Sequence, residues 1–243
     1  MHRYLLMFMA FWAIALPACG SSGDDPAKVS AAASLKPAFT TLDTDAQFSF
    51  AGSDQLAGQI RAGGRPDVFA AANAKLPDSL YADGLVEKPV AFARNELVIA
   101  VAASNKAIQS VDDLAGDGVT LAIGANAVPV GDYTLKVLAK LPRPTAAQIL
   151  KNARSREPDV SGIVGKVSQG AVDAGFVYAS DVRASSGRLR AVHLPTSLRP
   201  VVVYKAAVVK DAPNPGAARK FVASLTSAAG SGALRDAGLQ PPP

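Results

Sequence analysis

The chain has 243 residues, of which 49% are hydrophobic, and a formal net charge of +5; this length is enough for one large domain or for two lobes with separate cores. The lysines and arginines are scattered, without basic runs and with few aromatic residues beside them, which argues against nucleic acid as a partner. The single cysteine excludes an intrachain disulfide and a cysteine-based metal site.

The N-terminus resembles a bacterial lipoprotein signal. Residues 1–18 contain Arg3 and then an apolar run that is too short to span a bilayer stably, and they end just before Cys19. We therefore expect cleavage before Cys19, a lipid on its thiol, and a flexible tether over residues 19–27. Pro17 departs from the usual small residue at its place. The alternative is an ordinary secretory signal with an incidental cysteine.

Beyond the tether, apolar runs of strand length alternate with helical segments, which is typical of a parallel α/β sheet. The predicted strands are 28–32, 47–51, 68–71, 96–102, 119–123, 174–178, 189–194 and 201–209. The predicted helices are 56–61, 77–83, 133–139, 146–153 and 162–168, followed by two helices within 215–237 that are separated near Gly230.

Two predicted strands bracket the central hundred residues. They begin at Leu97 and at Val201, and the chain after the second strand supplies only helices. This pattern indicates two α/β lobes joined by two crossing strands, with the first lobe at 28–100 plus 201–243 and the second at 101–200. A single open sheet would produce a similar pattern.

Residues suited to catalysis are scarce. No nucleophile elbow, Walker loop, dinucleotide-binding turn or zinc-protease helix occurs in the sequence. His193 is the only histidine after removal of the signal, and its place on a predicted strand favours a structural role. Asp112 and Asp113 fit a turn that opens a helix. We therefore expect no enzyme, no cofactor and no site for a transition-metal cation.

Five segments place neutral hydrogen-bond donors at the end of a strand or the start of a helix. In chain order they contain Ser34, Ser53, residues 128–131, residues 158–162 and Tyr178. Ser34 and Ser53 are predicted to cap helices, and Asp159 is a natural N-cap. Helix N-termini and the carboxyl edges of α/β sheets are where anions and other ligands bind, so the set predicts a cradle for an oxyanion.

The strings that contain these donors resemble the extracytoplasmic molybdate-binding protein of molybdate ABC transporters. They are AAASL at 31–35, AGS at 51–53 with LAGQI at 56–60, PDVFA at 66–70, VPVG at 128–131 and FVYASD at 176–181. Their order is that of the family, and the resemblance covers essentially the whole mature chain. It implies a type II periplasmic-binding-protein fold, in which two α/β lobes hold a tetrahedral oxyanion in the cleft between them.

The resemblance also implies a set of ligand-binding residues for molybdate or tungstate. Ser34 and Ser53 would bind from the first lobe through hydroxyl and backbone N–H groups. Val130 and Val160 would bind from the second lobe through their N–H groups, and Tyr178 through its hydroxyl. Molybdenum would be bound only as the oxyanion, because these residues do not contact the metal directly. Helix dipoles and charge-assisted hydrogen bonds would offset the desolvation of the dianion, and the size of the cage would select against sulfate.

The function that follows is a substrate-binding lipoprotein of an ABC importer. Its partners would be the oxyanion, the permease and, through the lipid on Cys19, the outer face of the cell membrane; we expect a monomer. Asp54 stands where the family commonly has a small neutral residue, and Val130 where it often has alanine. The alternatives are selectivity for tungstate, sulfate or phosphate, with Asp54 accepting a proton from phosphate, an enzyme with Ser34 as nucleophile, and the sensing domain of a regulator.

Overall fold

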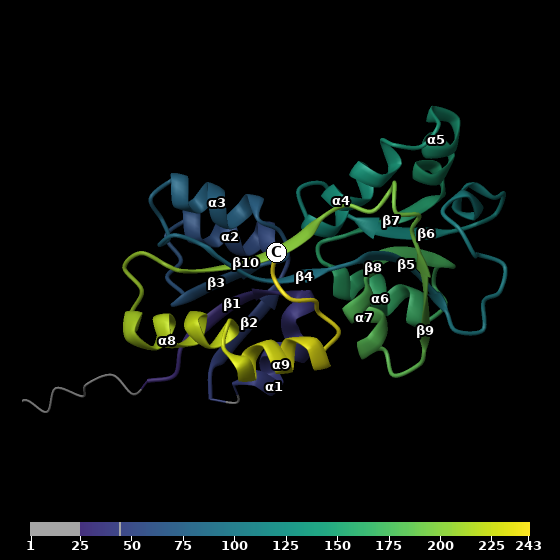
Figure 1. Cartoon of the computed structure of the whole chain (residues 1–243). Helices are drawn as coiled ribbons and strands as arrows, with labels where there is room; N and C mark the ends of the chain where they lie inside the picture. Colours follow the sequence, from purple (N-terminus) through teal and green to yellow (C-terminus); the bar gives the residue numbers. More distant parts are fainter. Residues whose placement is uncertain (1–24, 44) are drawn as a thin grey trace, which may run out of the picture.

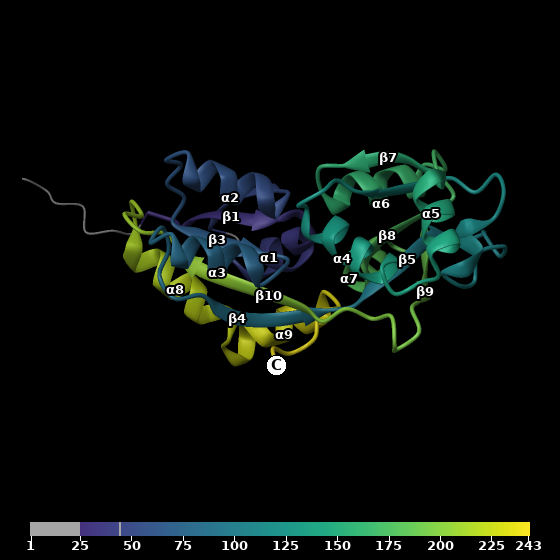
Figure 2. The same cartoon turned by 90° about the horizontal axis from the view of Figure 1, so that it is seen from above.

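The computed structural model describes residues 25–43 and 45–243. The predicted signal and Cys19 lie outside the described residues. The described part of the chain forms two α/β lobes that lie side by side (Figure 1, Figure 2), and each lobe is built on a five-stranded sheet. The predicted two-lobed fold is confirmed, and the alternative of a single open sheet is wrong.

The sheet of the first lobe combines four N-terminal strands with one strand that returns from the second lobe. Its strands are β1 (Lys28–Ala32), β2 (Gln47–Ala51), β3 (Val68–Ala71), β4 (Val90–Asn95) and β10 (Val202–Val208), in the order β2-β1-β3-β10-β4. β2, β1 and β3 pair in parallel, whereas β10 is antiparallel to both β3 and β4. The sheet is therefore mixed and not parallel throughout, because β10 enters it from the second lobe while its neighbours run toward that lobe.

The sheet of the second lobe is also mixed. Its strands are β5 (Leu97–Ala102), β6 (Leu121–Gly124), β7 (Ala153–Glu157), β8 (Ala174–Tyr178) and β9 (Leu189–His193), in the order β7-β6-β8-β5-β9. β5 pairs along its whole length with β8 and β9, antiparallel to both. The boundary predicted at residue 100 thus falls inside a strand of the second sheet, and the chain crosses at Glu96, between β4 and β5.

Helices pack against both sheets. They are α1 (Lys36–Leu42), α2 (Ser53–Arg61), α3 (Lys75–Ala82), α4 (Pro129–Leu138), α5 (Arg143–Asn152), α6 (Val160–Ser168), α7 (Ala179–Ala184), α8 (Pro215–Leu225) and α9 (Ala228–Asp236), with 3₁₀ turns at Ala33–Leu35 and Asp112–Ala115. In the first lobe α2 and α3 cover one face of the sheet, and α1, α8 and α9 cover the other (Figure 1). Among the helices described, none has the length and apolar character needed to span a membrane.

The core of the first lobe is built around Phe39 of α1. This side chain is fully buried, and its ring centroid lies 5.4 Å from that of Phe221 on α8 and 5.9 Å from those of Phe48 and Phe92 on β2 and β4. These rings attach the C-terminal helix α8 to the sheet, because aromatic side chains bury large apolar areas. The C-terminal segment therefore completes the lobe that the N-terminal segment begins.

The structure differs from the sequence prediction at the C-terminal helices. The predicted break at Gly230 is wrong, because Gly230 lies in the first turn of α9. Ser227 caps that helix by accepting a hydrogen bond from the Gly230 N–H at 3.0 Å, so the break lies between Leu225 and Ala228. Glycine is needed at 230 because a Cβ there would lie 2.0 Å from the carbonyl oxygen of Ser224.

Candidate functional site

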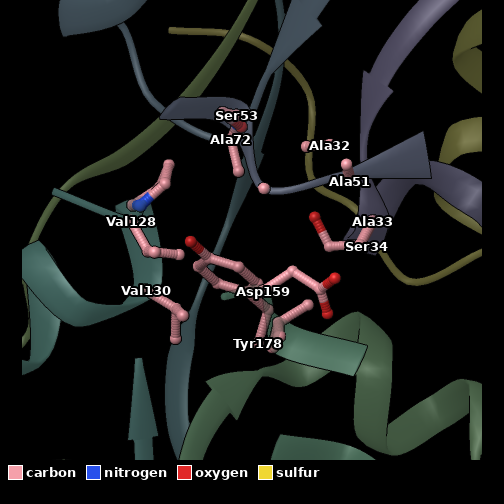
Figure 3. A pocket seen from close by; sticks show the side chains of 13 residues that line it. Ala32, Ala33, Ser34, Ala51, Ser53, Ala72, Val128, Val130, Asp159 and Tyr178 are labelled. Atoms are coloured by element: carbon pink, nitrogen blue, oxygen red, sulfur yellow. The ribbon is translucent and has the colours of Figure 1, made fainter. Parts of the chain in front are cut away.

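A small cavity lies between the lobes, at the ends of the parallel strands of both sheets. The residues that line it follow β1, β2 and β3 in the first lobe and β6, β7 and β8 in the second, and they are Ala32, Ala33, Ser34, Ala51, Gly52, Ser53, Ala72, Val128, Pro129, Val130, Asp159, Val160 and Tyr178. All five residues predicted to bind the oxyanion are among them (Figure 3). The volume is about 20 Å³, which suits a compact solute and not an extended one.

Ser34 lies inside the 3₁₀ turn that follows β1. Its side chain is buried, and its hydroxyl oxygen lies 2.9 Å from the hydroxyl oxygen of Tyr204 on β10. The prediction that Ser34 caps a helix is wrong, because Ala32 precedes the turn and no side-chain cap is formed there within the described chain. The hydroxyl interacts with Tyr204 instead.

Ser53 is the first residue of α2, and Gly52 occupies the N-cap position. The Ser53 hydroxyl accepts a hydrogen bond from the backbone N–H of Ala72, just beyond β3, at 3.2 Å. The predicted helix cap is therefore wrong here as well. Because the hydroxyl oxygen accepts from Ala72, its own proton is available for donation into the cavity, and the first-turn N–H groups of α2 keep no side-chain partner.

Val130 and Val160 bring backbone N–H groups to the cavity from the second lobe. Val130 follows Pro129 in the first turn of α4, and Val160 is the first residue of α6. First-turn N–H groups have no acceptor inside their own helix, and the helix dipole adds partial positive charge around them. Asp159 caps α6 as predicted, accepting from the Gly162 N–H at 3.1 Å.

The Tyr178 hydroxyl is the least satisfied polar group at the cavity. Tyr178 ends β8 and is 1% exposed, and its hydroxyl oxygen is buried without a hydrogen-bond partner among residues 25–43 and 45–243. Leaving such a group unpaired costs about 1–3 kcal/mol, so an orphan hydroxyl in a cavity indicates a bound ligand. Burial raises the pKa of the Tyr178 hydroxyl well above its ordinary value, which keeps it a proton donor.

Three tyrosines meet where the lobes join. The Tyr178 ring lies 6.5 Å from Tyr133 of α4 and 5.9 Å from Tyr204 of β10 between ring centroids, both in edge-to-face geometry. Burial raises the pKa of Tyr133 to about 12 and that of Tyr204 well above its ordinary value. All three phenols therefore stay neutral at physiological pH, and Tyr178 and Tyr204 connect the two lobes through an apolar contact.

The charges near the cavity are acidic. None of the described residues that line it is lysine or arginine, and Asp159 is the one charged lining residue. Asp54, in the first turn of α2, has a buried Oδ1 that finds no hydrogen-bond partner in the described chain. An anion bound here must therefore be stabilised by neutral donors and helix dipoles.

Asp181 is a buried carboxyl that the sequence analysis missed. It lies in the first turn of α7, and its Oδ2 accepts a hydrogen bond from the Tyr178 N–H at 2.9 Å. Burial is the largest effect on Asp181 and raises its pKa to about 7, although this hydrogen bond acts in the opposite direction. The spacing of three residues from a strand end to an acid, seen in YASD, is the sequence signal that could have found it.

The other residues singled out from the sequence lie away from the cavity. His193 ends β9 and is exposed, with its Nδ1 3.0 Å from Glu96 Oε1. Asp113 accepts hydrogen bonds from the N–H groups of Gln109 and Ser110, which lower the pKa of the carboxyl and form the predicted turn. In the part of the chain that the structure covers, no three His, Cys, Asp or Glu side chains gather as metal ligands would.

Comparison with known proteins points to one class of protein. The family described as bacterial extracellular solute-binding protein matches residues 27–240. The molybdate-binding protein ModA of Mycobacterium tuberculosis is 36% identical over 237 residues, covering 93% of this chain and 88% of that protein. The periplasmic molybdate-binding protein of Azotobacter vinelandii has a TM-score of 0.78 at 21% identity, covering 89% of this chain and all of that one. The sulfate-binding protein SubI of M. tuberculosis has the same TM-score at 17% identity, with 89% and 86% covered, and so shares the fold.

The raised pKa of Asp181 predicts a pH-dependent stability. Between the ordinary value of 3.8 and the folded value of about 7, the folded chain holds a proton that the unfolded chain releases, so stability falls as pH rises through this window. Asp181→Asn removes the charge and keeps an oxygen for the Tyr178 N–H. We expect it to raise the free energy of unfolding by up to about 4 kcal/mol at pH 8 and to change it little near pH 4.

Denaturant unfolding at both pH values measures this difference. Asp117→Asn, at an exposed aspartate in a loop of the second lobe, is the matched control and should leave stability unchanged at either pH. An equal effect of Asp181→Asn at pH 4 and pH 8 would contradict the assignment of the titrating group.

Proposed function

We propose, from the premise that this chain belongs to the molybdate-binding protein family of the bacterial extracellular solute-binding proteins, that it captures molybdate, and tungstate with it, for an ABC importer. The observation that carries the proposal is the orphan hydroxyl of Tyr178, buried in a cavity surrounded by neutral donors. A tetrahedral oxyanion supplies the acceptor that this hydroxyl lacks.

The proposed cage combines donors from both lobes. Ser34 and Ser53 bind through hydroxyl and backbone N–H groups of the first lobe, and Val130, Val160 and Tyr178 bind from the second. The N-termini of α2, α4 and α6 meet at the cavity, and each contributes about half a positive charge. Together they offset the desolvation of a dianion without a cationic side chain.

Donor geometry also provides the basis for selectivity. The Ser53 hydroxyl accepts from Ala72, and Tyr178 stays protonated, so both direct protons into the cavity. Sulfate has shorter bonds than molybdate and leaves some of the donors unpaired in a cage of fixed size. Phosphate carries a proton that needs an acceptor, and the unpartnered Oδ1 of Asp54 is the observation that keeps phosphate as the second candidate.

Closure of the lobes brings two backbone segments into contact beside the cavity. Gly52 of the first lobe approaches Pro158 of the second so closely that a Cβ on Gly52 would lie 2.3 Å from the Pro158 carbonyl oxygen. Lys75 on α3 and Asp132 on α4 lie 3.9 Å apart across the same side. The absence of a side chain at Gly52 therefore lets the lobes enclose the ligand.

Placement at the membrane is a further part of the proposal. A lipid on Cys19 and the tether over residues 19–27 would hold the body at the outer face of the cytoplasmic membrane, where the permease of the importer receives the oxyanion. The lipoprotein pattern of the sequence supports this placement.

We expect isothermal titration to find one molybdate site per chain, comparable binding of tungstate, and far weaker binding of sulfate and phosphate. The expectation follows from cage size and from the protons that the hydroxyls direct inward. Sulfate that competes as well as tungstate would disprove the size argument, and tight phosphate binding would favour the second candidate.

The same titration tests the cage through Tyr178→Phe. This variant keeps the ring and removes the hydroxyl, so molybdate binding should weaken by about 10- to 100-fold, as expected for a lost hydrogen bond to a charged ligand. Tyr81→Phe, at a half-exposed tyrosine of α3, is the control and should bind like the parent.

Gly52→Ala should interfere with closure. The added methyl group meets the Pro158 carbonyl, so the lobes stay apart and molybdate affinity should fall at least about 10-fold, while the thermal midpoint of the free protein stays close to that of the parent. Gly58→Ala is the control, because a Cβ at this position of α2 meets no atom of the described chain within 4 Å. Small-angle scattering with saturating molybdate measures the compaction, and equal compaction of Gly52→Ala and the parent would refute the role of this contact.

Cys19→Ser should release the protein from the membrane fraction without changing molybdate affinity, because the residue precedes the folded body. Membrane fractionation followed by titration of the released protein measures both effects. Retention of the variant in the membrane fraction would show that the attachment does not depend on this thiol.

A further inference from the structure

A chain of buried hydrogen bonds leads from the crossing between the lobes to Ser34. The Asn95 Nδ2 group donates to the Tyr204 hydroxyl at 3.3 Å and to the Ser180 hydroxyl at 2.8 Å, and the Tyr204 hydroxyl lies 2.9 Å from that of Ser34. All four residues are at most 6% exposed. Asn95 ends β4 and Ser180 lies in α7, so the chain of bonds spans both lobes.

The direction of these bonds is fixed at Asn95. The Glu96 backbone N–H donates to Asn95 Oδ1 at 2.9 Å, which orients the side-chain amide so that its nitrogen faces Tyr204 and Ser180. An amide nitrogen donates only, so the Tyr204 oxygen accepts from it. The phenol proton then goes to Ser34, its other partner in the described chain. Since the Ser34 oxygen accepts this bond, the Ser34 proton is left for the cavity.

The strand geometry around Tyr204 supports a built arrangement. The register between β10 and β4 shifts between Tyr204 and Lys205, because Tyr204 pairs with Ala93 and Lys205 with Ala91. Such an irregularity re-aims side chains, and here Tyr204 lies edge-to-face against both Phe92 and Tyr178. The ring is therefore held between the sheet of the first lobe and the ligand-binding tyrosine of the second.

We propose that Asn95 and Tyr204 are positioning residues that fix Ser34 as a proton donor to the bound oxyanion. The inference rests on the proposed function, because it assigns a role toward the same ligand. Neither residue lines the cavity. They act through Ser34, and they make the donor state of that hydroxyl a property of the crossing between the lobes.

A double-mutant cycle tests the relay. Tyr204→Phe keeps the ring and removes the hydroxyl, and we expect it to weaken molybdate binding by about 3- to 10-fold in the parent, the range of one hydrogen bond. In the Ser34→Ala background the same change should alter the dissociation constant less than about twofold, because Ser34 is the group through which Tyr204 acts. Tyr81→Phe, the exposed control, should have no effect in either background.

Asn95→Asp reverses the relay and decides the matter if Tyr204→Phe does not fold. The new carboxylate still accepts from the Glu96 N–H, but it also accepts the Tyr204 proton, so Ser34 must donate to Tyr204 and present a lone pair to the anion. We expect about 10- to 100-fold weaker molybdate binding in the parent. The effect should be much smaller in the Ser34→Ala background, where only the repulsion by the added charge remains.

Thermal unfolding of every variant accompanies the titrations. Equal effects in both backgrounds, for either Tyr204→Phe or Asn95→Asp, would overturn the relay while leaving molybdate binding by the parent intact. A parent chain that binds no molybdate would overturn the proposed function and, with it, the role of the relay. The two failures are therefore distinguishable in one set of measurements.

Discussion

The constraint on which this structure depends is the desolvation of an anion in a cavity without a cationic side chain. A buried dianion is very costly unless every oxygen is paired, and lysine or arginine would be the simplest partners. Instead, the cavity is lined by hydroxyls and by the N-termini of helices. This solution requires several helices to begin at one place. Two sheets whose parallel strands end at a common cleft provide that arrangement.

The same constraint accounts for the bonding of the two serines. A serine that caps its own helix uses up one of the N–H groups that the anion needs. Ser34 and Ser53 do not do so, because their hydroxyls interact with Tyr204 and with the Ala72 N–H. Asp159 does cap α6, but it takes the Gly162 N–H and leaves that of Val160. The local bonds thus leave the first-turn donors available for the ligand.

Much of the fold could be predicted from the sequence, because most of its strands are apolar and buried. β1, β2, β3 and β8 match the predicted ranges residue for residue. β7 was missed because it is an edge strand in which partly buried and exposed residues alternate, with two arginines in five residues. β4 was missed because its pairing with β10 is irregular and its apolar residues do not alternate regularly. Antiparallel pairing depends on where the chain returns, which periodicity does not encode.

The site divides in the same way. Residues at the ends of strands could be named from local strings, and all of them line the cavity. Asn95, Tyr204 and Asp181 could not, because their importance lies in contacts across 85 to 170 positions of the chain or in burial that only the tertiary structure creates. The acceptors chosen by Ser34 and Ser53 belong to this second group.

The order of strands in the first sheet has a consequence for how the chain folds. The second lobe is one uninterrupted segment, whereas β10, between β3 and β4, is supplied from beyond it. While the protein is being synthesised, β3 and β4 therefore stay unpaired on their inner edges until more than a hundred further residues have been added. Exposed strand edges are prone to wrong pairing. The second lobe can complete its sheet first, and the first lobe, although it begins the chain, must finish last.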